Sequence, residues 1–163
     1  AVGAAAEAGL HLTPAVLGAI EAAGAAIHRV ELVVGLGTFR PITADKVTDH
    51  VMHAEHYVVP EGTWAAVTSA ERVVAIGTTS VRALESAASR GELAGATDLF
   101  IRRPYEWRVV GAMLTNFHLP RSSLLVMIDA FVGPRWRDLY ATGLAEGYRF
   151  LSFGDAMFLE RSA

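Results

Sequence analysis

The stretch Gly35-Leu36-Gly37-Thr38-Phe39-Arg40-Pro41 is the most informative segment for the fold, because an apolar segment precedes it and a strongly polar one follows it. Its two glycines allow the backbone to approach a ligand closely. The polar segment at residues 49–57 supplies acids, bases and hydrogen-bond donors. Residues 77–82 and 114–120 are further polar turns that follow apolar runs. We expect a functional site where these segments meet.

Apolar runs that end in polar turns and continue into helical patterns predict an α/β fold, with a largely parallel or mixed sheet and flanking helices. Strands are predicted at residues 27–34, 53–59, 72–76, 97–102 and 108–115, with a final hairpin formed by 148–153 and 157–160. Helices are predicted at 14–23, 60–70, 124–132 and 136–146, with another between the turn at 77–80 and Gly91, and a helical turn at 44–49. The apolar end of 27–34 indicates a strand covered on both faces. We expect residues 1–163 to form a single α/β domain.

Composition excludes several classes of protein. The chain of 163 residues is 52% hydrophobic and has no cysteine, so disulfides and cysteine-ligated zinc are impossible. Its apolar runs are shorter than the roughly 20 residues that span a bilayer, which predicts a cytoplasmic protein without a membrane partner. The net charge is −3, yet residues 102–163 carry eight arginines against six acidic residues. A polyanion would therefore be expected to bind this second half.

Three histidines at a spacing of three raise the question of a metal site. His50, His53 and His56 surround Glu55 in sequence. Neither a helix nor a strand would bring three of these side chains to one point, so we expect no metal. On a strand, His53 and Glu55 would share a face and could act as an acid–base pair. Ordinary surface or core histidines are the other interpretation.

Two further polar turns are candidate ligand sites. The turn at residues 77–80 precedes a helix whose free N–H groups favour an anion, and Arg82 would strengthen that preference. The alternative is a helix start with nothing bound. Asn116 and His118 follow a predicted strand, where α/β sheets place ligands. Asp155 follows Gly154, so it is either a turn former or an acid.

Five segments in register resemble one known family, the S-adenosylmethionine:tRNA ribosyltransferase-isomerases (QueA) of queuosine biosynthesis. The resemblance runs from about Ala8 to Phe158 and rests on residues 35–41, 49–53, 76–86, 115–120 and 148–157. It covers about the second half of the family's chain. It implies part of the larger catalytic domain, with the N-terminal part and the inserted β-barrel absent. The isolated chain is then expected to show weak turnover or none.

The resemblance implies a reaction and a set of site residues. The family moves the ribosyl group of S-adenosyl-L-methionine, a substrate, onto 7-aminomethyl-7-deazaguanine in the tRNA anticodon, giving epoxyqueuosine and releasing adenine and methionine. The chemistry needs a base beside the sulfonium and an acid for adenine. The catalytic candidates are His53, Glu55, His118 and Asp155. The substrate-binding candidates are Gly35, Gly37, Thr38, Phe39, Thr78, Thr79, Ser80, Arg82, Asn116 and Tyr148, and the tRNA-binding candidates are Arg102, Arg103, Arg121 and Arg149.

Some positions depart from the family's pattern. Arg102-Arg103-Pro104 stands where the family usually has Tyr-Pro-Gly, Asp129 stands where serine is common, and Glu7 replaces a hydroxyl residue. Two alternative functions therefore stay open. One is a metal-dependent hydrolase that uses the histidine cluster. The other is a diverged, non-catalytic module that binds a nucleoside.

Overall fold

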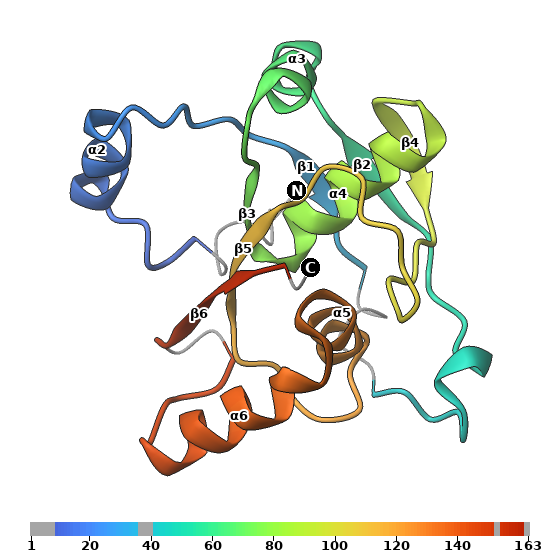
Figure 1. The fold of residues 1–163 in the computed structure, drawn as a ribbon. Coiled ribbons are helices and arrows are strands. Elements are labelled where there is room, and N and C mark those ends of the chain that lie inside the picture. Colours follow the sequence, from blue (N-terminus) through green and yellow to red (C-terminus); the bar gives the residue numbers. More distant parts are fainter. Residues whose placement is uncertain (1–8, 36–40, 152–153, 162–163) are drawn as a thin grey trace.

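The computed structural model describes residues 9–35, 41–151 and 154–161, and it confirms the α/β class (Figure 1). Its helices are α2 (Pro14–Ala22), α3 (Glu61–Ser69), α4 (Gly77–Arg90), α5 (Ser123–Val132) and α6 (Trp136–Ala145), with short 3₁₀ turns η2 (Val47–Asp49) and η3 (Gly133–Arg135). Its strands are β1 (Glu31–Val33), β2 (Glu55–Val58), β3 (Val74–Ile76), β4 (Ala94–Thr97), β5 (Ala112–Asn116) and β6 (Ala156–Glu160).

The strands form two small sheets. One has the order β1-β2-β4 and is antiparallel, and the other has the order β3-β5-β6. In the second sheet β3 runs parallel to β5 while β6 runs antiparallel to it, so this sheet is mixed. The prediction of a strand covered on both faces at 27–34 is wrong, because β1 alternates exposed, buried, exposed. The strand that does have buried residues on both faces is β5, which lies between two neighbours.

Helix α4 lies between the two sheets and packs against β1, β3 and β5 (Figure 1). Gly77 begins the helix with a φ of 83°, a value that glycine adopts without steric cost. Gly91 ends the helix in a left-handed conformation and donates its N–H to the carbonyl of Ala87, as the sequence predicts. Nine consecutive or near-consecutive residues of α4 are buried, including the charged Arg82 and Glu85. The helix therefore carries polar groups into the interior.

The side chain of Glu85 explains why β5 begins later than predicted. The strand was expected from residue 108 but begins at Ala112. The backbone N–H groups of residues 108, 109 and 110 donate to the Glu85 carboxylate, at 3.0, 3.1 and 2.9 Å. The Tyr105 hydroxyl also donates to it, at 3.2 Å. These N–H groups are thus unavailable to a neighbouring strand.

The predicted strand at residues 97–102 is wrong, because β4 ends at Thr97. The Thr97 hydroxyl is 2.6 Å from that of Ser86 and accepts the N–H of Leu99 at 3.2 Å. The Thr97 carbonyl accepts a hydrogen bond from Arg82 at 3.5 Å. These contacts turn the chain away from the sheet directly after Thr97.

The predicted C-terminal hairpin is also wrong for the described residues. β6 pairs with β5, and residues 148–151 form no strand. Leu151 has a φ of 65° and donates its N–H to the carbonyl of Phe117 at 2.9 Å. Residues 152 and 153 lie outside the described residues. The last strand is therefore held by the central strand, not by its sequence neighbour.

The other predicted helices are confirmed to within one or two residues. Ser122 caps α5 by accepting the N–H of Leu125 at 3.1 Å, and Thr13 caps α2. In α6, Gly143 permits close packing, because a Cβ there would lie 2.7 Å from the ring of Phe117. Helix α2 has no buried residue. No helix in the described part of the chain is long and apolar enough to cross a membrane.

Candidate active site

The parallel pairing of β3 and β5 brings the residues that follow both strands to one edge of the sheet. Ile76 is opposite Leu114, so the first turn of α4 and the end of β5 meet there. Asn116 is paired with Ala156, the first residue of β6. Asp155, directly before Ala156, therefore also lies at this edge. We call these segments, residues 77–78, 115–118 and 154–156, the β3–β5 edge.

Two buried polar atoms at this edge have no hydrogen-bond partner among the described residues. They are Oδ1 of Asn116 and Nδ1 of His11. Nε2 of His11 lies 2.6 Å from the carbonyl oxygen of Gly154, and because a carbonyl can only accept, this nitrogen donates. Nδ1 of the neutral ring is then an acceptor. The edge thus presents two unsatisfied acceptors, and His11 was not among the predicted site residues.

His118 is buried at the same edge. Its Nε2 is 2.9 Å from the Thr115 hydroxyl, and its backbone N–H donates to the Tyr140 hydroxyl at 2.9 Å. Burial lowers the pKa of His118 to about 4, so the imidazole is neutral near pH 7. A neutral ring at this position can accept a proton.

The depressed pKa of His118 predicts a pH-dependent stability. The unfolded chain binds a proton on this histidine below about pH 6.5, whereas the folded chain binds it only below about pH 4. Stability therefore falls as the pH drops through this interval. We expect the free energy of unfolding to decrease by about 2 kcal/mol between about pH 7 and about pH 4.5 on account of this residue. Urea unfolding of wild type and His118→Gln at both pH values measures this difference.

The control for this experiment is His28→Gln, since His28 is exposed. It should leave the pH dependence of the wild type unchanged. If His118→Gln and wild type lose the same stability on acidification, the buried ring is not responsible.

Asp155 lies half-buried in the turn before β6. It accepts the backbone N–H of Arg149 at 2.5 Å, and the Arg149 Nε lies 3.5 Å from the same oxygen. The aspartate thus forms the turn and also carries a carboxylate at the β3–β5 edge. Tyr148 is 46% exposed, and its ring centroid lies 5.6 Å from that of Phe117.

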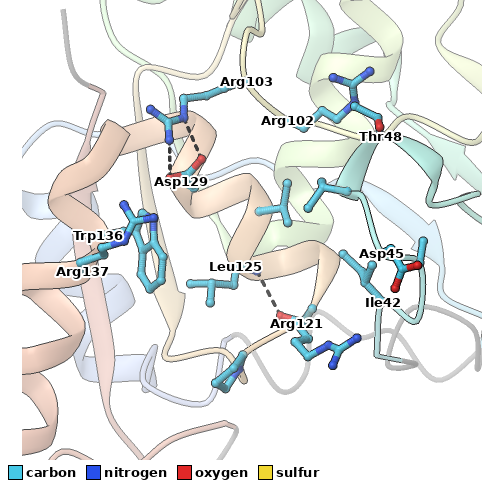
Figure 2. Close-up of a pocket in the computed structure, with 15 residues that line it drawn as sticks. Ile42, Asp45, Thr48, Arg102, Arg103, Arg121, Leu125, Asp129, Trp136 and Arg137 are labelled. Carbon is cyan, nitrogen blue, oxygen red and sulfur yellow. Dashed lines mark hydrogen bonds and ion pairs between the residues drawn. The ribbon is translucent and has the colours of Figure 1, made fainter.

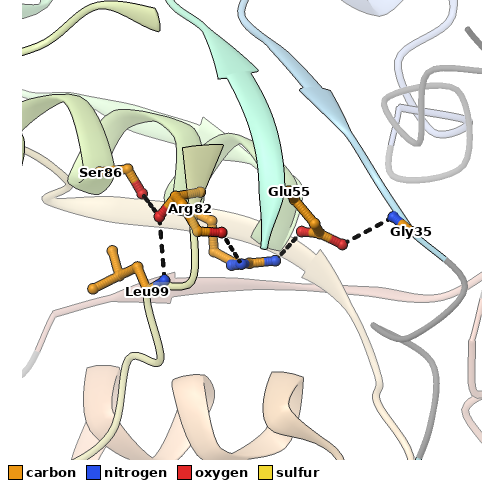
Figure 3. A network of polar contacts seen from close by, with 6 residues as sticks. Gly35, Glu55, Arg82, Ser86 and Leu99 are labelled. Atoms are coloured by element: carbon orange, nitrogen blue, oxygen red, sulfur yellow. Dashed lines mark hydrogen bonds and ion pairs between the residues drawn. The ribbon is translucent and has the colours of Figure 1, made fainter. Parts of the chain in front are cut away.

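Glu55 lies elsewhere, in a buried ion pair with Arg82 of α4 (Figure 3). The two side chains are 1% and 3% exposed. The second carboxylate oxygen accepts the backbone N–H of Gly35 at 3.1 Å. Glu55 therefore links Gly35, the first residue of the glycine-containing stretch, to Arg82 of α4. Arg82 lies one helical turn after Thr78. Residues Gly37, Thr38 and Phe39 lie outside the described part.

The structure does not place His53 on the face of Glu55. Glu55 and Tyr57 are buried and His56 is exposed, the alternation typical of a half-buried strand. His53 precedes the strand and is exposed. His50 makes an edge contact with Phe100, at a centroid distance of 5.3 Å. Within the described residues, no group of three or more acidic or histidine side chains could hold a metal ion.

The predicted anion site at the start of α4 contains one buried hydroxyl residue. Thr78 is buried, while Thr79 and Ser80 are half-buried. The Ser80 hydroxyl donates to the Ile76 carbonyl at 2.7 Å, which gives it a structural partner. The predicted arginines separate into two places. Arg102, Arg103 and Arg121 line one groove, whereas Arg149 lies beside Asp155.

A mixed sheet with polar groups gathered beyond the carboxyl ends of two parallel strands is typical of α/β proteins that bind a ligand at that edge. The chain belongs to the family of queuosine biosynthesis proteins, whose family model matches residues 1–159. This confirms the resemblance seen in the sequence.

Relatives that are about half identical to the chain share one name. The chain is 55% identical over 153 residues to the S-adenosylmethionine:tRNA ribosyltransferase-isomerase of Rubrobacter xylanophilus, covering 93% of this chain and 46% of the relative. It is 49% identical over 164 residues to the same enzyme of Thiobacillus denitrificans, covering 96% and 48%. The crystal structure of the S-adenosylmethionine tRNA ribosyltransferase of Thermotoga maritima matches with a TM-score of 0.77 and 38% identity, over 93% of this chain and 50% of that one. The chain thus spans about half the length of these relatives.

Proposed function

We propose that this chain supplies the S-adenosylmethionine-binding half of a tRNA ribosyltransferase-isomerase that acts in the cytoplasm. The name of the relatives supports the proposed reaction. The pair of unsatisfied acceptors supports the β3–β5 edge as the binding site of S-adenosylmethionine. Buried polar atoms in folded proteins are nearly always hydrogen-bonded, so two unpartnered acceptors at one edge indicate a ligand that donates.

S-adenosylmethionine carries the donors that this edge lacks. Its adenine has an exocyclic amino group, and its methionine part has an ammonium group. Asn116 Oδ1 and His11 Nδ1 can each accept one such hydrogen bond. The N-terminal turn of α4, with the buried Thr78, offers free N–H groups for the methionine carboxylate. The edge therefore suits a zwitterionic nucleoside.

The acid–base roles follow from burial and contacts. The base must break a C–H bond beside the sulfonium and take the proton, leaving the electron pair on carbon. Asp155 is the candidate, because its carboxylate lies at the edge and is only partly covered. When the bond to the ribose breaks, adenine leaves with the electron pair and takes up a proton. The candidate donor is His118, which contacts Thr115; because its imidazole is neutral near pH 7, it must first accept a proton, such as the one that Asp155 removes, before it donates one to adenine.

The other two predicted catalytic residues have different positions. Both carboxylate oxygens of Glu55 are engaged, one with Arg82 and one with Gly35. This supports a positioning role for Glu55 in holding the stretch after β1. His53 is exposed and lies outside the β3–β5 edge.

Calorimetric titration of this chain with S-adenosylmethionine tests the binding part of the proposal. We expect saturable binding by the wild type and roughly tenfold weaker binding by Asn116→Ala, because one hydrogen bond to the ligand is lost. Thr68→Ala is the control, since Thr68 is exposed and its hydroxyl donates to carbonyls of its own helix. Equal affinity of Asn116→Ala and wild type would mean that the ligand does not bind at this edge. Adenosine binding as tightly as S-adenosylmethionine would favour the nucleoside-binding module.

A further inference from the structure

A groove of about 690 Å³ lies between the segment 42–48 and helix α5, and it extends to the start of α6 (Figure 2). Its volume is within the roughly 300–1,000 Å³ that small-molecule and nucleotide sites occupy. Ile42, Pro120 and Leu125 contribute apolar surface. The groove shares none of its lining residues with the β3–β5 edge.

The groove carries an excess of positive charge on a chain whose net charge is −3. Four arginines and two aspartates line it, an excess of two positive charges. These residues are Arg102, Arg103, Arg121, Arg137, Asp45 and Asp129. Such local excess, and not the net charge, decides whether an anion binds.

Asp129 is already neutralised by Arg103. The Arg103 Nε donates to Oδ2 of Asp129 at 2.7 Å and its Nη2 donates to Oδ1 at 2.8 Å, a bidentate pair. Both residues are departures from the family's pattern, and the structure shows that they contact each other. The pair leaves Arg102, Arg121 and Arg137, against Asp45, to set the charge of the groove.

Arg121 is held in a conformation that most residues avoid. Its φ is 59°, in the left-handed region, where a non-glycine side chain costs about 1 kcal/mol or more. Its carbonyl accepts the N–H of Ile42 at 2.7 Å, which fixes the backbone against the opposite wall of the groove. The guanidinium makes no ion pair with any residue that the structure describes. The charge is thus available to a ligand.

A second available guanidinium lies across α5 from Arg121 (Figure 2). The Arg137 guanidinium carbon is 4.8 Å from the centroid of the Trp136 ring. This cation–π contact orients the arginine without neutralising it. Arg102 likewise has no ion-pair partner in the described part of the chain.

We infer that this groove binds the phosphodiester backbone of an RNA strand, an inference that rests on the proposed tRNA substrate. Planar guanidinium groups match phosphate oxygens, and three of them without a carboxylate partner surround apolar surface on which a ribose or base can pack. A peptide made of acidic residues offers the same charge but no flat ring for that surface. The arginines, and not the aspartates, are then the residues that determine affinity.

Fluorescence anisotropy with a labelled RNA hairpin whose loop has the length of an anticodon loop tests the inference on this chain. Arg121→Gly removes the charge while keeping a residue suited to the positive φ, so the fold is retained. We expect roughly tenfold weaker binding at low salt, the loss for one charge-assisted hydrogen bond, regardless of loop sequence. The slope of log affinity against log salt should fall by about one. Arg102→Ser should behave in the same way.

Arg72→Gly is the matched control, because Arg72 pairs with Glu160 and does not line the groove. Wild-type affinity and salt slope in both Arg121→Gly and Arg102→Ser would overturn the inference. So would displacement of the RNA by polyglutamate at an equal concentration of charge. S-adenosylmethionine binding at the β3–β5 edge is measured separately and does not depend on either result. Failure of the RNA-binding inference is therefore distinguishable from failure of the proposed function.

Discussion

Replacing Glu85 by alanine is expected to lower the free energy of unfolding by about 5 kcal/mol. The carboxylate is 0% exposed and accepts the N–H groups of residues 108–110 and the Tyr105 hydroxyl. Each buried donor left without an acceptor costs about 1–3 kcal/mol. Burial, and after it the neighbouring Glu85 carboxylate, raise the pKa of Tyr105 well above its usual value, so its hydroxyl stays a donor. Urea unfolding followed by circular dichroism measures the change.

Glu106→Ala is the matched control for Glu85→Ala. The Glu106 side chain is 85% exposed and lies in the loop that Glu85 holds. Its removal should change stability by less than about 0.5 kcal/mol. If Glu85→Ala does not fold, Glu85→Gln keeps one acceptor oxygen and should show an intermediate loss. A loss below about 1 kcal/mol in either variant would contradict the account of how β5 begins.

Replacing Glu55 by alanine is expected to cost about 3–5 kcal/mol, because it leaves the Arg82 guanidinium buried and without its carboxylate. It also removes the acceptor for the Gly35 N–H. Truncating one partner of a buried ion pair costs far more than the pair itself contributes. The same denaturation experiment measures this loss.

The double variant Glu55→Leu/Arg82→Leu separates the cost of the unpaired charge from the cost of lost packing. It should recover most of the stability that Glu55→Ala loses, since neither member of the pair is then left as an unpaired buried charge. Glu160→Ala, in the exposed pair with Arg72, should cost less than about 1 kcal/mol. Equal losses for Glu55→Ala and Glu160→Ala would show that the buried pair does not hold the β1-β2-β4 sheet to α4.

Local patterns predicted the helices well but the strand ends poorly. The cap at Gly91 acts within a few residues of the helix that it ends, so the sequence alone is enough to place it. The start of β5 depends on Glu85, which lies more than twenty residues earlier in the chain. The partner of β6 is likewise chosen by tertiary packing against β5. No local pattern contains that information.

In the candidate site, too, local sequence predicted some residues, whereas others depend on tertiary contacts. Asn116 and His118 were predicted from their places after a strand and Asp155 from its place after Gly154, whereas the register of β3, β5 and β6 brings them to one edge. His11 was missed, because its contact is with Gly154, at the other end of the chain. Glu55 was predicted as an acid or base, but the buried partner Arg82 comes from a different helix. The contact between Arg103 and Asp129 could not be predicted from either residue alone.

The most direct test of the central claim is adenine release by a chimera. In it, this chain replaces the segment that it matches over 153 residues in the enzyme of Rubrobacter xylanophilus. With S-adenosylmethionine and tRNA, the chimera should release adenine, and Asp155→Asn in the chimera should slow release by roughly 10²–10⁴-fold, the usual contribution of a positioned acid or base. A folded chimera that binds S-adenosylmethionine but releases no adenine, or an Asp155→Asn variant as fast as its parent, would contradict the account.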